Sequence, residues 1–162
     1  MVAKTKSAYK ITLPSDRELV MTRVFNAPRA LVFQAHIDPE QIAQWWGPRA
    51  YTTIVDKLEA RVGGAWRFIN RRADGSEEAF RGEYRELAPP ERITWTFEWE
   101  GLPGHIGLET MTFAEHDGQT TLTTTSHFNT REERDGMLAN GMEGGANESA
   151  DRLEELLERL QA

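Results

Sequence analysis

Alternating hydrophobic and polar positions predict a sheet through the middle of the chain. From Ile93 to Trp99, large apolar side chains alternate with threonine and glutamate, the period of a strand with one aromatic face. Turn residues separate runs of this kind, and Asp74-Gly75, for example, lies between Trp66–Arg71 and Ala79–Leu87. The pattern predicts seven strands: Glu18–Phe25, Tyr51–Ala60, Trp66–Arg71, Ala79–Leu87, Ile93–Trp99, Leu108–Glu115 and Gln119–Phe128.

Helical spacing replaces this alternation in two places. Two short helices are predicted after the first strand, one capped by Asn26 that ends near Ile37, and one that starts after Asp38-Pro39 and ends at Trp46. Thr130 and Glu133 form a capping-box pattern that begins a C-terminal helix. Its apolar stripe consists of Met142, Ala146, Ala150, Leu153, Leu157 and Leu160.

Four glycines weaken the start of this helix, so we expect its long regular segment to begin near Asn140. A twisted seven-stranded sheet curls, and one helix in its concave face does not fill the space. Small residues such as Gly145 would then border a cavity with aromatic walls. Alternatively, the glycines only let helix and strand backbones approach closely, and the sequence leaves both interpretations open.

Composition narrows the range of function. The 162 residues fit one domain, which we place at 15–162 after a flexible tail at 1–14. The net charge of −7 argues against nucleic acid as a partner, and no apolar run is long enough for a membrane. Without cysteine, disulfides and thiolate chemistry are excluded. The opening residues carry no secretory signal, which predicts a cytoplasmic location.

Several motifs carry a resemblance to a known family. Asn26-Ala27-Pro28-Arg29, Asp38-Pro39-Glu40 and Trp45-Trp46-Gly47-Pro48 occur in the order found in START-like (SRPBCC) proteins of the heat-shock-protein-90 ATPase activator type. The resemblance continues through Gly63–Phe68, Gly82–Tyr84, Pro90–Ile93 and Gly141–Gly145. It implies an α+β helix-grip fold, as in START domains and birch-pollen allergens, in which a curved antiparallel sheet surrounds the C-terminal helix.

The resemblance leaves three functions open, because this superfamily hosts many activities. The leading hypothesis is a protein that binds a small apolar or aromatic ligand in an internal cavity. A cyclase or dehydratase would use the same cavity with a general base. A partner of a heat-shock ATPase is the weaker alternative, because the additional N-terminal domain of the eukaryotic activators is missing from this sequence. A homodimer is compatible with the resemblance.

Candidate site residues follow from these hypotheses. His127 is the best candidate for proton transfer, although a surface histidine is the more common outcome for such a position. Polar contacts to a ligand could come from Asn70, Thr124, Ser126 and Asn140. His36, His105 and His116 lack metal-ligand spacing, so no metal is predicted, and no cofactor motif occurs. The predicted ligand-binding residues are Trp46, Trp66, Phe68, Tyr84, Trp95, Phe97, Met111, Ser126, Met142 and Gly145.

Overall fold

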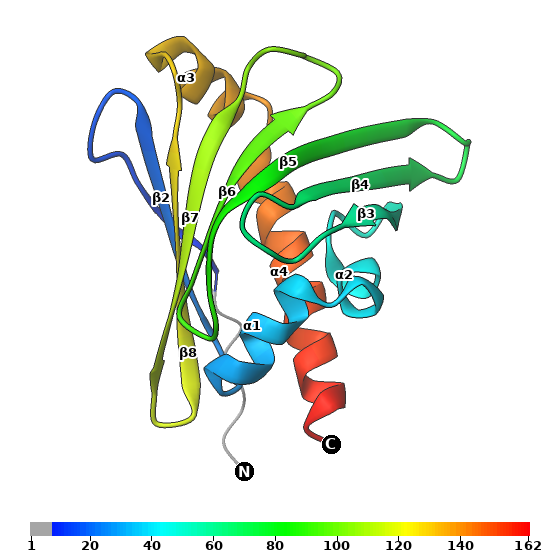
Figure 1. Ribbon diagram of the computed structural model, residues 1–162, viewed down its shortest axis with the longest axis vertical. Coiled ribbons are helices and arrows are strands. Elements are labelled where there is room, and N and C mark those ends of the chain that lie inside the picture. Colours follow the sequence, from blue (N-terminus) through cyan, green and yellow to red (C-terminus); the bar gives the residue numbers. More distant parts are fainter. Residues whose placement is uncertain (1–7) are drawn as a thin grey trace.

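The computed structural model describes residues 8–162 and contains one curved, fully antiparallel sheet (Figure 1). The sheet is a meander from β3 to β8, and β2 and β1 then complete the side next to β8. Its spatial order is β1-β2-β8-β7-β6-β5-β4-β3. The strands are β1 Lys10–Thr12, β2 Glu18–Phe25, β3 Tyr51–Leu58, β4 Ala65–Arg72, β5 Glu77–Ala88, β6 Arg92–Trp99, β7 Gly107–His116 and β8 Gln119–His127.

Within residues 8–162, four helices accompany this sheet. The long helix α4 lies along its concave side, α1 and α2 lie near one end of α4, and α3 lies at the opposite end (Figure 1). This arrangement confirms the predicted α+β helix-grip fold with two short helices after the first long strand. Within residues 8–162, none of the helices is long and apolar enough to cross a membrane. The helices are α1 Arg29–Ile37, α2 Pro39–Trp45, α3 Arg131–Ala139 and α4 Met142–Leu160.

The predicted number of seven strands is wrong, because the sheet has eight in the described part of the chain. The additional strand, β1, pairs with β2 in the register Ile11 opposite Met21. It falls inside the stretch 1–14 that we expected to be a flexible tail, of which residues 1–7 lie outside the described part of the chain. Three residues are too short for a visible alternation, so the sequence pattern gave no signal for this strand. The division of the chain into a tail and one domain stays a prediction.

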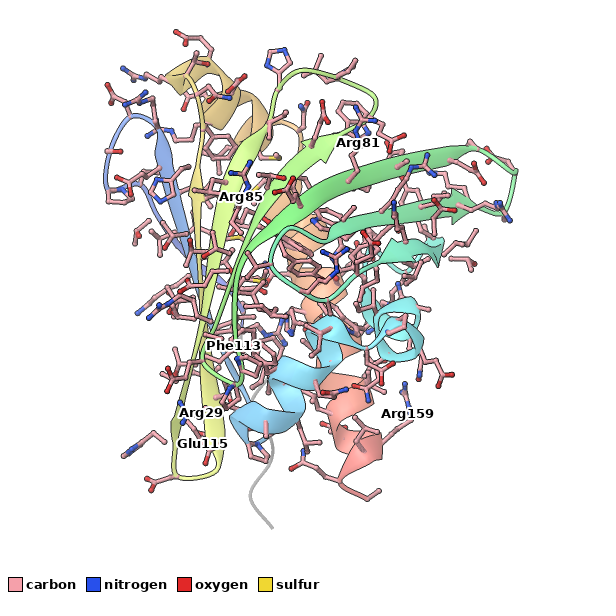
Figure 2. The ribbon with its side chains drawn as sticks, in the orientation of Figure 1. Arg29, Arg81, Arg85, Phe113, Glu115 and Arg159 are labelled. Atoms are coloured by element: carbon pink, nitrogen blue, oxygen red, sulfur yellow. The ribbon has the colours of Figure 1, made fainter. Side chains whose placement is uncertain are left out.

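The start of α1 also differs from the prediction. The N-cap residue is Pro28 and not Asn26, and it offers no side-chain acceptor. A carboxylate from β7 supplies one instead, because the backbone N–H of Arg29 donates to Oε1 of Glu115 over 2.8 Å (Figure 2). Asp38 caps α2 as predicted, accepting from the backbone N–H of Glu40.

The C-terminal helical region divides at Gly141. The hydroxyl of Thr130 accepts from the N–H of Glu133, which confirms the predicted cap. The helix that starts there ends at Ala139, and Gly141 then adopts a left-handed conformation with φ of 76°. Only glycine adopts this conformation readily, so α3 and α4 are separate helices with different directions.

The two faces of the sheet have different surroundings. On the concave face, Leu153, Leu156 and Leu157 of α4 are buried in the hydrophobic core. Such burial contributes roughly 1.5–3 kcal/mol per side chain. The convex face carries ion pairs between strands, among them Arg81 of β5 (labelled in Figure 2) with Glu98 of β6 at 2.8 Å. Exposed ion pairs of this kind contribute little stability.

Candidate functional site: a cavity between sheet and helix

A cavity of about 710 Å³ lies between the concave face of the sheet and α4. This volume falls within the roughly 300–1,000 Å³ of ordinary small-molecule sites. Its rim includes Trp99 and Leu102, which are 38% and 51% exposed, so the cavity has a mouth beside the β6–β7 turn. Tyr9, which precedes β1, also lines it. The stretch expected as a tail thus contributes a side chain to the wall.

The helix side of the cavity is made of small residues. Gly145, Ala146 and Ser149 line it from α4. A Cβ atom added at Gly145 would lie 3.7 Å from Cγ of Pro48 and would approach no strand backbone within 4 Å. Gly145 therefore borders open volume, which favours the cavity over the close-packing interpretation at this position. Gly144 next to it is exposed and is not part of the lining.

Aromatic side chains from three strands, together with Trp46, form much of the sheet side. Trp95 and Phe97 of β6 line the cavity together with Phe68 of β4 and Phe80 of β5. Trp46, which follows α2, meets the rings of Phe68 and Phe80 edge to face, at 5.1 and 5.2 Å between ring centroids. Edge-to-face pairs favour one mutual orientation of the rings. The wall is thus preformed and not assembled from mobile side chains.

Two predicted ligand-binding residues are placed differently. Trp66 and Tyr84 are fully buried and do not line the cavity. Trp66 stacks on Trp95 with 4.1 Å between centroids, so it supports the wall from behind. Burial also raises the pKa of Tyr84 well above its usual value, and its hydroxyl has no hydrogen-bond partner among the described residues. Both positions act as core in this structure.

A carboxyl group that the sequence analysis did not single out lies in the wall. Glu109 of β7 faces the cavity between Trp95 and Ser126, its cross-strand neighbours on β6 and β8. The indole N–H of Trp95 donates to its Oε1 over 2.8 Å, and the hydroxyl of Ser126 donates to its Oε2 over 3.2 Å. Burial raises the pKa of Glu109 even though both hydrogen bonds favour the ionised form.

A signal for Glu109 was present in the sequence. It alternates with Met111 and Phe113, two buried residues of the same strand, and the period of two therefore places it on the inner face. Its charge suggested an exposed position, because glutamate is seldom buried without a partner. The alternation, and not the charge, therefore predicts the position of this side chain correctly.

The other ionisable groups of the lining give the cavity a negative character. Four glutamates line it, whereas no lysine or arginine does so among residues 8–162. His36 of α1 is buried and hydrogen-bonded through Nδ1 to the carbonyl oxygen of Val32 at 2.7 Å. Its burial lowers the pKa to about 4, so this ring is neutral at pH 7. The glutamates are Glu78, Glu109, Glu132 and Glu133.

The histidine that we expected as the proton-transfer candidate lies at the edge of the cavity. His127 is the last residue of β8, and its Nδ1 lies 3.6 Å from Oε2 of Glu18 on the neighbouring strand. Ser126 beside it is buried, whereas the His127 side chain is 47% exposed. Since successive side chains of a strand point to opposite faces, the His127 ring lies away from Glu109.

The mouth is bridged by a second histidine. Nδ1 of His105, in the β6–β7 turn, is hydrogen-bonded to Oε1 of Glu133 on α3. The side-chain amide of Asn129, which lies between β8 and α3, donates to the carbonyl oxygen of Ile106 over 2.8 Å and ties the same turn to the residues before α3. Among residues 8–162, no three side chains of the metal-ligating types form a cluster that could hold an ion.

The structure brings most of the predicted residues to one cavity. The predicted polar residues Asn70, Thr124, Ser126 and Asn140 also line it. That any of these residues binds a ligand stays a prediction. The predicted ligand-binding residues in the lining are Trp46, Phe68, Trp95, Phe97, Met111, Ser126, Met142 and Gly145.

Solved structures share this architecture. A crystal structure from Rhodobacter sphaeroides is 22% identical, covers 94% of this chain and 99% of its own, and superposes with a TM-score of 0.88. A protein from Chromobacterium violaceum is 30% identical over 89% of this chain and 99% of its own, with a TM-score of 0.78. DynU16, described as a putative protein in the dynemicin biosynthetic locus, is 22% identical and covers 90% of this chain and 48% of its own, with a TM-score of 0.66.

The comparison with curated proteins found no match. A family model, in contrast, matches residues 26–158, from the residues before α1 to the last turn of α4. The match includes every long strand of the sheet except β2. Together with the relative from Chromobacterium violaceum, this match confirms the resemblance that the motifs around Trp45-Trp46-Gly47-Pro48 indicated. The chain belongs to the family described as activator of Hsp90 ATPase homolog 1-like proteins.

Proposed function

We propose that this protein binds a small apolar or aromatic molecule in the cavity between its sheet and α4. The observation that carries the proposal is the cavity itself, which has about 710 Å³ of volume and an aromatic wall. Apolar surface removed from water contributes about 25 cal/mol per Å² to binding. A wall whose rings are held by mutual edge-to-face contacts loses little entropy when a ligand enters.

The small residues on α4 support the same proposal. Gly145 has no side chain at a position where α4 faces the cavity. Glycine within a helix costs roughly 0.5–1 kcal/mol relative to alanine. A chain that needed only a well-packed core would gain stability from a larger residue there. The presence of glycine at this position therefore favours a function for the cavity.

The test fills this space and compares it with a matched change outside it. Gly145→Leu places a side chain into the cavity, and Gly144→Leu adds the same side chain one residue away on the exposed side of α4. The neutral dye N-phenyl-1-naphthylamine, which fluoresces in apolar surroundings, serves as the probe. We expect Gly145→Leu to weaken dye binding at least about tenfold, since overpacking a filled site costs about 1–3 kcal/mol, and Gly144→Leu to leave it unchanged.

Both variants should keep the circular dichroism and cooperative unfolding of the parent protein. Equal dye binding by the parent and by a folded Gly145→Leu protein would contradict the proposal. Native mass spectrometry of the purified protein adds an independent readout, because a retained molecule should be present in the parent and absent from Gly145→Leu. The same variant separates this proposal from docking on a heat-shock ATPase, which would not depend on the volume of the cavity.

A further inference from the structure

The cavity has a charge pattern that selects among apolar ligands. Its lining contains four glutamates and, within the described residues, no lysine or arginine. The basic side chains of the described lining are histidines: His36 is neutral at pH 7, whereas His105 and His127 lie beside Glu133 and Glu18. A ligand with a carboxylate or phosphate group would therefore find no lysine or arginine there to pair with. Since like charges in surroundings of low dielectric repel strongly, this pattern disfavours fatty acids and other anionic amphiphiles.

Glu109 is the member of this set that lies within the aromatic wall. Both of its carboxyl oxygens accept hydrogen bonds from neutral donors, the indole of Trp95 and the hydroxyl of Ser126. These donors fix the orientation of the carboxyl group, but they do not neutralise its charge. The described part of the chain places no cation in an ion pair with it, whereas Glu98, Glu100 and Glu133 all have basic partners.

The hydrogen-bond chemistry shows which kind of group could complete this site. An indole N–H only donates, so Oε1 of Glu109 serves as an acceptor towards Trp95. A carboxylate oxygen has two lone pairs, and each oxygen of Glu109 therefore has capacity for a second donor. Glu109 lines the cavity, so a second donor can reach the carboxylate from there. A donor that carries positive charge would stabilise the ionised carboxylate against the cost of its burial.

The surrounding rings are suited to the same kind of group. Trp95 forms the hydrogen bond itself, and Phe97 lies two residues further along the same face of β6, in the lining. Aromatic faces attract cations within about 6 Å of the ring centre. A carboxylate beside aromatic rings is thus a site for an organic ammonium group.

We propose that the cavity selects small molecules that join an aromatic or alicyclic body to an ammonium group, with the ammonium paired to Glu109 and the body against the aromatic wall. This inference rests on the proposed function and specifies its ligand class. The acidic mouth, with Glu132 and Glu133 on α3, favours entry of the same cations.

The test uses three probes of one shape and different charge: 1-naphthylmethylamine, 1-naphthylmethanol and 1-naphthoate. Their affinities are measured by isothermal titration calorimetry at pH 7. For the parent protein we expect the amine to bind roughly tenfold to a hundredfold more tightly than the alcohol, as a hydrogen bond to a charged group warrants, and the acid to bind more weakly than both.

Glu109→Gln keeps the shape and the acceptor for Trp95 but removes the charge. We expect it to abolish the preference for the amine while the affinity for the alcohol stays within about threefold. Glu143→Gln is the matched control, since it removes an exposed charge outside the lining and should keep the preference.

Three outcomes separate the two proposals. Equal binding of amine and alcohol by the parent protein would overturn the assignment of Glu109 and leave the cavity proposal intact. A preference that survives in Glu109→Gln would likewise overturn it. Binding of none of the three probes, together with dye binding that Gly145→Leu does not weaken, would contradict the proposed function itself.

Discussion

The indole N–H of Trp95 lies 2.8 Å from Oε1 of Glu109, across the strand pair β6–β7 at directly opposed positions. This contact joins the aromatic wall of the cavity to its buried acid. Trp95 is in turn stacked on Trp66, so the orientation of the carboxyl group depends on a chain of packed rings. The arrangement holds Glu109 rigidly in a place where an ionised side chain is costly.

Replacement of Glu109 by glutamine should therefore stabilise the empty protein. Because its folded-state pKa is raised, the parent protein loses stability as pH increases from the unfolded-state value of about 4.3 through the folded-state value. We expect Glu109→Gln to be more stable by about 1–2 kcal/mol at pH 8 and nearly equal to the parent at pH 4. Urea unfolding at both pH values measures this, and a less stable variant at pH 8 would contradict it.

A second pH effect comes from His36. Burial lowers its pKa from 6.5 to about 4, so the contribution of the neutral ring is complete above pH 6.5 and is lost as pH falls towards 4. The loss amounts to about 3 kcal/mol over that interval. His36→Phe should flatten the stability curve between pH 6.5 and 4, whereas His116→Phe, at a fully exposed position, should leave its slope unchanged.

Local patterns in the sequence predict some elements of this fold, whereas others depend on contacts between residues far apart in the chain. Alternation and turn residues suffice for the long strands, because each long strand has one buried face. The short strand β1 lacks this signal, and its place is determined by pairing with β2. The start of α1 depends on Glu115, which is 86 positions away from Arg29 and thus invisible to a local pattern.

The site shows the same limit more sharply. A period of two predicts that Trp66, Trp95 and Phe97 face inward, but not whether each meets open space or another ring. Trp95 and Phe97 meet the cavity, whereas Trp66 lies behind Trp95. Glu109 is the opposite case. The alternation of β7 predicts that its side chain faces inward, but buried carboxylates are rare, and the residue was therefore not chosen as a site candidate.

A buried ion pair between β2 and α4 gives a third prediction. Arg23 is 2% exposed, and its Nη2 lies 3.0 Å from Oδ1 of Asp151, while its guanidinium lies over the ring of Phe25. Asp151→Ala should destabilise the protein by about 3 kcal/mol because it leaves a buried charge unneutralised. Adding Arg23→Met should restore a substantial part of this loss. Guanidinium unfolding of both variants tests the coupling, and strictly additive effects would argue against it.

The close contact between β5 and β6 gives a fourth prediction. A Cβ atom on Gly82 would lie only 1.8 Å from the carbonyl oxygen of Thr96, so Gly82→Ala requires the strands to separate. We expect a loss of more than about 3 kcal/mol, visible as a lower melting temperature. Gly144→Ala is the matched control, because it meets open space in a helix and should add about 0.5–1 kcal/mol.

The burial of Glu109 also links the ligand to the lifetime of the protein. If an ammonium group pairs with this carboxylate, the bound ligand raises the free energy of unfolding, because it binds the folded state and not the unfolded one. Copies without a ligand would unfold more often and would be degraded first by cellular proteases. The abundance of the protein in a cell would then follow the supply of the molecule that it holds.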